Sequence, residues 1–116
     1  LTDEWEKRGV KEGIEFAILT DEITQAWTGL TTKEYKKLKG IKKENLRDNM
    51  TNLELVLNML AETATTEISD KQEPKTLNEN KSVAREGGSV AGNARREIEM
   101  KTGKNVITKS KPKMLK

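Results

Sequence analysis

The sequence predicts an all-α fold: a small multi-helix domain with a helix-turn-helix-like amino-terminal part and a long helical hairpin. Helix-capping patterns recur along the chain, apolar residues recur at a spacing of three and four, and aromatic residues are scarce. A chain of 116 residues is long enough for one domain with a modest core. We expect residues 1–103 to form the helical domain and residues 104–116 to form a basic, flexible tail. Because the first residue is Leu1 rather than Met, we expect the chain to be a piece of a longer protein.

The amino-terminal part contains "GIEFAILTDEITQAWTGLTTKEYKKLKG", which predicts a helix from Thr20, a turn at Gly29 and a second helix from Thr31. Thr31 and Glu34 have the spacing of a capping box, in which each side chain accepts a hydrogen bond from a free backbone N–H of the other residue. Gly40 is a suitable end for this second helix. The order helix, glycine turn, helix resembles a helix-turn-helix reader of DNA. Helical hairpins with glycine turns are also common in all-helical proteins, so both interpretations stay open.

The middle of the chain predicts a long amphipathic helix. Thr51 and Glu54 form a second capping-box pattern, and the helix is expected to run from about Asn52 to Ser69. A third possible box pairs Thr76 with Glu79 at the start of the following segment. The apolar face expected to enter the core comprises Leu53, Val56, Leu57, Met59, Leu60, Ala64 and Ile68.

The stretch "REGGSVAGNARREIE" has two glycines separated by four residues, the spacing of a nucleotide-binding loop. Such a loop needs a Lys after its second glycine and then a Ser or Thr, but Asn93 and Ala94 stand in those places. We instead predict a helix whose small side chains let another helix approach closely, against the face of Ala61 and Ala64. A glycine hinge between two shorter helices is the alternative. The candidate packing residues are Gly87, Gly88, Ala91 and Gly92.

The composition argues against an enzyme. The chain has no Cys and no His, so it lacks a thiol nucleophile, the usual general base and the commonest metal ligand. Glu54, Glu62 and Glu67 are a conceivable carboxylate cluster, but neither a nucleophile nor a phosphate loop accompanies them. We therefore predict no catalytic residue, metal site or cofactor. Without a long apolar run or a signal peptide, the chain is expected to be cytoplasmic and not to contact a membrane.

Charge is distributed in blocks along the chain. Residues 32–47 carry seven bases and two acids, and residues 81–116 carry ten bases and three acids, whereas residues 1–31 and 48–80 are net acidic. Basic blocks of this kind predict contact with nucleic acid or with an acidic protein surface, although a solvated face is the common outcome. The candidate DNA- or partner-binding residues are Lys36, Lys37, Lys39, Lys42, Lys43 and Arg47.

Three segments taken together resemble a known family. "RGVKEGIEFAILTDEI", "KGIKKENLRDNMTNLELVLNMLAETATTEI" and "NENKSVAREGGSVAGNARREIEMKTGKNVI" are similar to the carboxy-terminal region of the DNA-damage-inducible protein D family. The likeness covers residue 8 to about residue 107. Members are bacterial proteins of the SOS response that usually also carry an amino-terminal domain like that of BRO and phage antirepressor proteins. That domain is not present in these 116 residues, in keeping with a longer protein.

The resemblance implies a non-enzymatic binding module of an SOS-response protein, which modulates recombinase filaments or DNA repair through protein or DNA contacts. The implied partner is the SOS recombinase filament, and DNA contact would be nonspecific and salt-sensitive. The alternative is a structural or dimerisation domain of a phage-antirepressor-like regulator. In that case the small-residue stripe could pack against a second copy, giving a homodimer.

Overall fold

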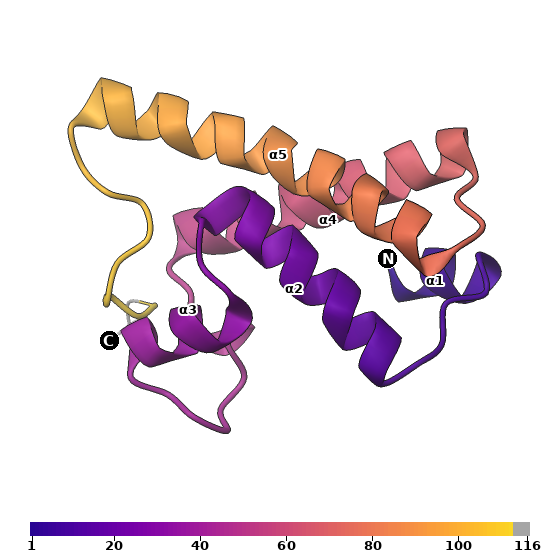
Figure 1. Cartoon of the computed structure of the whole chain (residues 1–116). Coiled ribbons are helices and arrows are strands. Elements are labelled where there is room, and N and C mark those ends of the chain that lie inside the picture. The colour runs from indigo at the N-terminus through magenta and orange to yellow at the C-terminus, as the bar shows by residue number, and fades with distance from the viewer. Residues whose placement is uncertain (113–116) are drawn as a thin grey trace.

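The computed structural model describes residues 1–112, and this range is all-α, as predicted. No strand occurs among these residues. Figure 1 shows α5 lying across both α2 and α4, with α3 at the end of the molecule where the carboxy-terminal segment descends. The elements in chain order are α1 (Thr2–Lys7), α2 (Ile14–Thr28), α3 (Thr32–Lys39), the 3₁₀ helix η1 (Arg47–Asn49), α4 (Asn52–Gln72) and α5 (Leu77–Thr102).

Both clear capping boxes are present, because they are local devices that the sequence encodes within four residues. The Thr31 hydroxyl accepts from the Glu34 N–H at 3.1 Å, and the Glu34 carboxylate accepts from the Thr31 N–H at 2.9 Å. Thr51 and Glu54 make the same pair of bonds at the start of α4. α3 ends at Gly40, which has the left-handed backbone conformation (φ 72°) that a non-glycine residue adopts only with strain.

Two helices are longer than predicted. α2 begins at Ile14 rather than Thr20, and α4 continues three residues beyond Ser69 to Gln72. α4 ends where Glu73 takes a left-handed conformation before Pro74. The added turn of α2 packs on the core through Phe16 and Leu19, whereas the three residues added to α4 are exposed.

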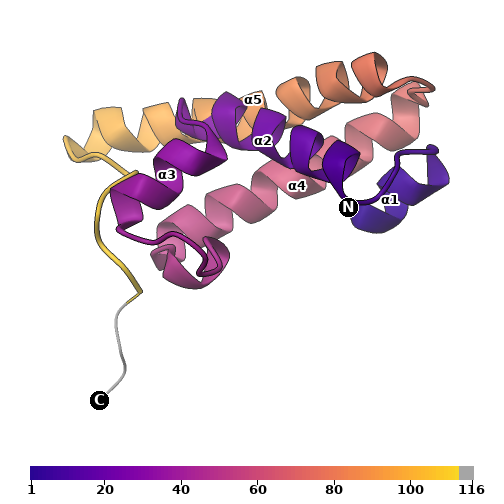
Figure 2. The same ribbon diagram turned by 60° about the horizontal axis from the view of Figure 1, so that its bottom comes forward.

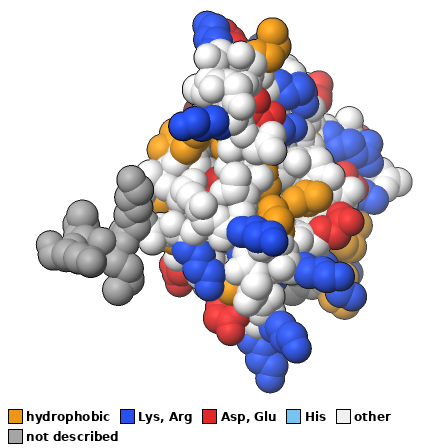
Figure 3. All heavy atoms as spheres, turned by 90° about the vertical axis from the view of Figure 1, so that its left-hand side faces the viewer, with side chains coloured by type: hydrophobic (Ala, Val, Ile, Leu, Met, Phe, Trp, Pro, Cys, Tyr) orange, Lys and Arg blue, Asp and Glu red, His pale blue; other side chains and the backbone are white. Residues whose placement is uncertain are grey.

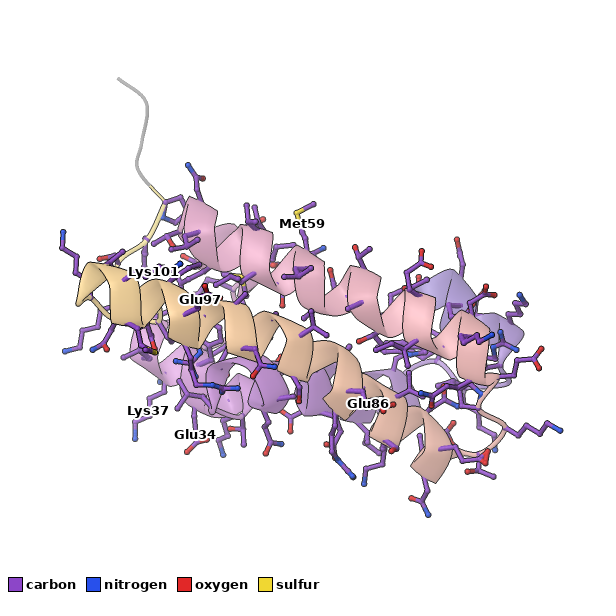
Figure 4. The ribbon with its side chains drawn as sticks, turned by 90° about the horizontal axis from the view of Figure 1, so that it is seen from above. Glu34, Lys37, Met59, Glu86, Glu97 and Lys101 are labelled. Carbon is purple, nitrogen blue, oxygen red and sulfur yellow. The ribbon has the colours of Figure 1, made fainter. Side chains whose placement is uncertain are left out.

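α5 is one continuous helix, so the predicted packed helix is confirmed and the hinge alternative is not. The third capping box is only half formed. The Thr76 hydroxyl accepts from the Glu79 N–H, whereas the Glu79 carboxylate accepts from the Lys75 N–H instead of closing the box. α4 and α5 form the predicted long hairpin, visible as two long helices side by side in Figures 1 and 4.

The glycines of α5 pack as predicted, but mostly against a different helix. A Cβ added at Gly88 would lie 2.5 Å from the Ala26 Cβ, and one at Gly92 would lie 2.8 Å from the Ala26 carbonyl oxygen. Ala26 belongs to α2, so the prediction of the α4 face as their partner is wrong for these two positions. Only Gly87 faces α4, where an added Cβ would lie 2.6 Å from the Thr65 Cα. The small-residue stripe, which includes the buried Ala91, is thus covered within the chain and is closed to a second copy.

The buried face of α4 also differs from the predicted one. Leu57 is buried as expected, whereas Val56 is 60% and Met59 is 53% exposed. Leu53 and Leu60 are also exposed. Small residues occupy the buried face where α5 lies close to it, as at Thr65 beside Gly87. That face consists of Glu54, Leu57, Ala61, Thr65 and Ser69.

Candidate functional site

α3 and the loop after it present most of the predicted basic block. The helix is fixed to α2 by the Asp21 carboxylate, which accepts a hydrogen bond from the Thr32 N–H at 2.7 Å. The turn between α2 and α3 is closed at Gly29, where the Thr28 hydroxyl accepts from the Leu30 N–H. These bonds orient α3 so that one face enters the core and the other faces solvent (Figure 2).

Four lysines make up what we call the α3 basic surface: Lys36, Lys37, Lys42 and Lys43. Lys37, Lys42 and Lys43 are exposed, and Lys36 is half-buried. None of the four forms an ion pair with any acid in residues 1–112. Figure 3 shows basic side chains on this end of the molecule, interspersed with acidic ones, and Figure 4 shows Lys37 pointing away from the helices. The positive charge of the surface is therefore not taken up by ion pairs within the described residues.

An open groove of about 1100 Å³ runs along the α3 basic surface. It is bounded by the start of α3, by the loop at Gly40–Lys42 and by Asp21 of α2. The Asp21 carboxylate accepts hydrogen bonds from the Thr32 N–H and from the Gln25 side chain. Both of its oxygens are therefore engaged within the protein. Lys36, Lys37 and Lys42 line the groove.

Arg47 lies at the margin of this surface and is already paired. Its guanidinium donates to the Glu62 carboxylate, and both side chains remain partly exposed. Both residues also line a cleft of about 520 Å³ between α1, α2, α3 and α4. Arg47 therefore contributes less free charge than the four lysines do.

Lys39 does not belong to the exposed surface, and its prediction as a contact residue is corrected by its burial. Its ammonium group is fully buried and lies 2.5 Å from the Glu54 carboxylate. It also donates to the Ser110 carbonyl, and the Tyr35 hydroxyl donates to the other Glu54 oxygen. The i, i+4 spacing of Tyr35 and Lys39 was the available signal, because it places Lys39 on the same face as a residue expected in the core.

Burial raises the pKa of Tyr35 far above its ordinary value, and the Glu54 carboxylate adds to the shift. The phenol therefore stays protonated and donates a hydrogen bond to Glu54. This arrangement serves structure rather than proton transfer, because the hydroxyl is enclosed between α3 and α4.

The conceivable carboxylate cluster does not form. Glu54 is buried with Lys39, Glu62 is paired with Arg47, and Glu67 is exposed. Within residues 1–112, no three acidic side chains gather closely enough to hold a metal ion. The glycine stretch of α5 is buried helix, so it offers no loop that could cradle a nucleotide phosphate.

The chain matches one known protein family over nearly its whole length. A match to the family described as the DinD C-terminal domain covers residues 1–112, in agreement with the resemblance found in the sequence. The chain belongs to the DinD C-terminal domain family. Searches of the curated proteins and of the solved structures gave no match. Membership in the DinD family places the basic surface in a DNA-damage-inducible protein family without assigning it a partner.

No helix in the described part of this DinD domain combines the length and the apolar character needed to cross a membrane.

Proposed function

We propose that this DinD domain is a non-enzymatic binding module of a bacterial SOS-response protein, acting on recombinase filaments or DNA repair. We further propose that its contact is electrostatic and is made by the α3 basic surface to DNA. The observation that carries the proposal is that Lys36, Lys37, Lys42 and Lys43 form no ion pairs within residues 1–112. Cations of this kind release counterions from the phosphate backbone when they bind it.

The aromatic residues indicate which part of the nucleic acid is contacted. Trp5, Trp27 and Tyr35 are buried, and Phe16 packs against Trp5 with ring centroids 5.4 Å apart. Proteins that grip single strands by their bases need exposed aromatic rings on which the bases stack. The basic surface has none, so phosphate contact without base recognition is the mode that its chemistry supports.

The test is a titration of a labelled duplex with the whole chain, measured by fluorescence anisotropy at several salt concentrations. Replacing Lys37 and Lys42 together by Ala removes two cations from the groove. The matched control replaces Lys71 and Lys75, which are exposed near the far end of α4, roughly 30 Å from its start. Both double variants change the net charge equally.

We expect Lys37→Ala/Lys42→Ala to weaken binding and to reduce the salt slope by roughly 1 to 2, since each lost phosphate contact removes about 0.9. The control is expected to change the slope by much less. Equal losses in the two variants would show that only net charge matters, and the α3 basic surface would then not be the site.

The alternative function, a dimerisation domain, has one structural observation in its favour. Leu53, Val56, Met59 and Leu60 leave an apolar strip exposed on α4, and Figure 4 shows Met59 pointing away from α5. A dimer would then form through this strip, because the glycine stripe of α5 is already covered by α2 and α4.

Light scattering across a range of protein concentrations tests this alternative. If α4 dimerises the domain, the measured mass doubles, and Val56→Lys/Met59→Lys returns it to that of one chain. A monomeric mass at all concentrations would contradict it.

A further inference from the structure

The carboxy-terminal segment, residues 104–112, folds back along the domain and is called the strap here. α5 ends at Gly103, whose left-handed conformation (φ 69°) turns the chain. In Figures 1 and 2 the strap then passes from the end of α5 to the side of α3. Val106 is 7% exposed and belongs to the core, and Ile107 packs against it. The rest of the predicted tail, 113–116, lies outside the described residues.

A chain of polar contacts fixes the root of the strap. The Arg95 guanidinium donates to the Trp27 carbonyl at 2.8 Å and to the Glu99 carboxylate at 2.8 Å. The other oxygen of Glu99 accepts from the Val106 N–H at 3.0 Å. The strap is thus connected through α5 to the end of α2, the helix that precedes α3.

The far part of the strap is held by the buried lysine. Lys39 donates to the Ser110 carbonyl while its charge is compensated by Glu54. Lys39 is therefore not available to contact a ligand at the α3 basic surface. It instead holds the strap, in which Lys109 and Lys111 are exposed.

The strap brings new positive charge to the α3 basic surface. Glu44, in the loop after α3, has its pKa lowered by the Lys42 N–H, which donates to it at 2.8 Å, and by the charges of Lys111 and Lys36. Lys111 and Lys36 are thus close enough to act on one carboxylate, although 75 positions separate them in the sequence. Neither Lys109 nor Lys111 pairs with an acid in residues 1–112.

We propose that the strap is a fixed second edge of the surface, and that Lys109 and Lys111 contact phosphates of the same duplex that the α3 basic surface contacts. Val106 is its positioning residue, because its burial holds the strap in place. This inference rests on the proposed function. It extends the DNA-binding site from the α3 basic surface to a second segment, the strap. A duplex backbone is the favoured ligand because the two edges present separate rows of cations without exposed aromatic rings between them.

The experiment uses the whole chain and a duplex of arbitrary sequence, with anisotropy measured from low to moderate salt. Lys109→Ala/Lys111→Ala removes the two strap cations, and Lys71→Ala/Lys75→Ala is again the control of equal charge. Val106→Ser loosens the strap without changing any charge, and Val106→Ile is the conservative variant that keeps the apolar contact. Hydrogen exchange at the Val106 N–H reports whether the strap has detached, since Glu99 protects that group.

We expect Lys109→Ala/Lys111→Ala to reduce the salt slope by roughly 1 to 2, like the α3 double variant. Val106→Ser should speed exchange at residue 106 and reduce the slope, whereas Val106→Ile should change neither. If Val106→Ser speeds exchange but leaves the slope intact, a loose tail binds equally well and the fixed edge is refuted.

The remaining outcomes separate this inference from the proposed function. If Lys109→Ala/Lys111→Ala matches the control while Lys37→Ala/Lys42→Ala loses affinity, the strap is excluded and the α3 site stands. If wild type does not bind the duplex, both fail. If polyglutamate displaces the duplex at equal charge concentration, the surface fits an acidic polypeptide, and the assignment to DNA is overturned.

Discussion

At the scale of single residues, Glu54 has three partners in the interior. One carboxylate oxygen accepts from the Lys39 ammonium and from the Thr51 N–H, and the other accepts from the Tyr35 hydroxyl. A buried charge is tolerated only when it is paired and hydrogen-bonded in this way. Glu54 therefore serves the start of α4 and the α3–α4 contact at the same time.

Removal of one member of this pair is expected to be costly. Lys39→Met leaves the Glu54 charge buried without its cation, and we expect it to reduce the free energy of unfolding by about 3–5 kcal/mol. Lys37→Met, on the exposed side of the same helix, should change it by less than about 0.5 kcal/mol. Urea unfolding followed by circular dichroism measures both. Equal midpoints for the two variants would mean that Lys39 is not enclosed as described.

Tyr35 gives a prediction about pH, because it is the only tyrosine in the chain. Its pKa is raised in the folded state by burial, with Glu54 adding to the shift, above an unfolded value of about 10. The folded state thus favours the protonated phenol. This contribution to stability is fully present below pH of about 10 and is lost as the pH rises further.

We therefore expect phenolate absorbance in the ultraviolet to appear only together with the loss of helical circular dichroism. In Tyr35→Phe the alkaline loss of stability should be smaller, since this titration is removed. A phenolate that forms while the helices remain intact would show that the hydroxyl is reachable by solvent.

At the scale of elements, α5 shows how a helix can contain three interior glycines. Each costs roughly 1 kcal/mol relative to alanine in an isolated helix. Here an added Cβ would meet backbone atoms of α2 or α4 at under 3 Å at Gly87, Gly88 and Gly92. The glycines let α2 and α4 lie close to α5. The dispersion contacts made there offset the low helix propensity of glycine.

Gly88→Ala/Gly92→Ala should consequently destabilise the domain, by about 1–3 kcal/mol, because the clash exceeds the gain in helix propensity. Ser89→Ala is the matched control, since residue 89 lies on the same turn but is exposed, and it should be neutral or slightly stabilising. Denaturant midpoints at two protein concentrations measure the effect. A gain in stability for the glycine variant would contradict close packing against α2.

α4 shows why a helix start marked by a capping box is predictable from the sequence when the buried face of the helix is not. Its start at Asn52 agrees with the sequence prediction, because the Thr51–Glu54 box is a signal within four residues. Its buried face was predicted from the large apolar residues, yet Leu53 and Leu60 are exposed while Thr65 is fully buried. The choice between the two faces depends on the glycines of α5, far along the chain, and a pattern within α4 carries no such information.

At the scale of the whole molecule, folding pairs some residues of each basic block and leaves others without an ion pair in the described part of the chain. Lys81 and Arg85 of α5 reach Glu22 of α2, and Arg95 pairs with Glu99. The lysines of the α3 basic surface have no such partners in the described part of the chain. The sequence predicts the charge blocks, whereas which of their residues form ion pairs depends on which helices become neighbours.

The overall charge arrangement leads to a last prediction about how the domain binds DNA. Six cations on the two edges are available to phosphates: Lys36, Lys37, Lys42, Lys43, Lys109 and Lys111. At about 0.9 per contact, we expect a plot of log K against log salt for duplex DNA to have a slope of roughly −5 when all six contact phosphates.

Base identity should not matter, because lysines that contact phosphates carry no sequence information. Trp5 and Trp27 are both under 4% exposed, so a bound duplex does not reach them. Duplexes of unrelated sequence should therefore bind with equal affinity, and tryptophan emission should not change on binding. Anisotropy and fluorescence in one titration check both points. A sequence preference above about tenfold would show that base edges are read, and quenching of the tryptophans would show that the core opens. In either case the electrostatic surface would be insufficient to explain binding.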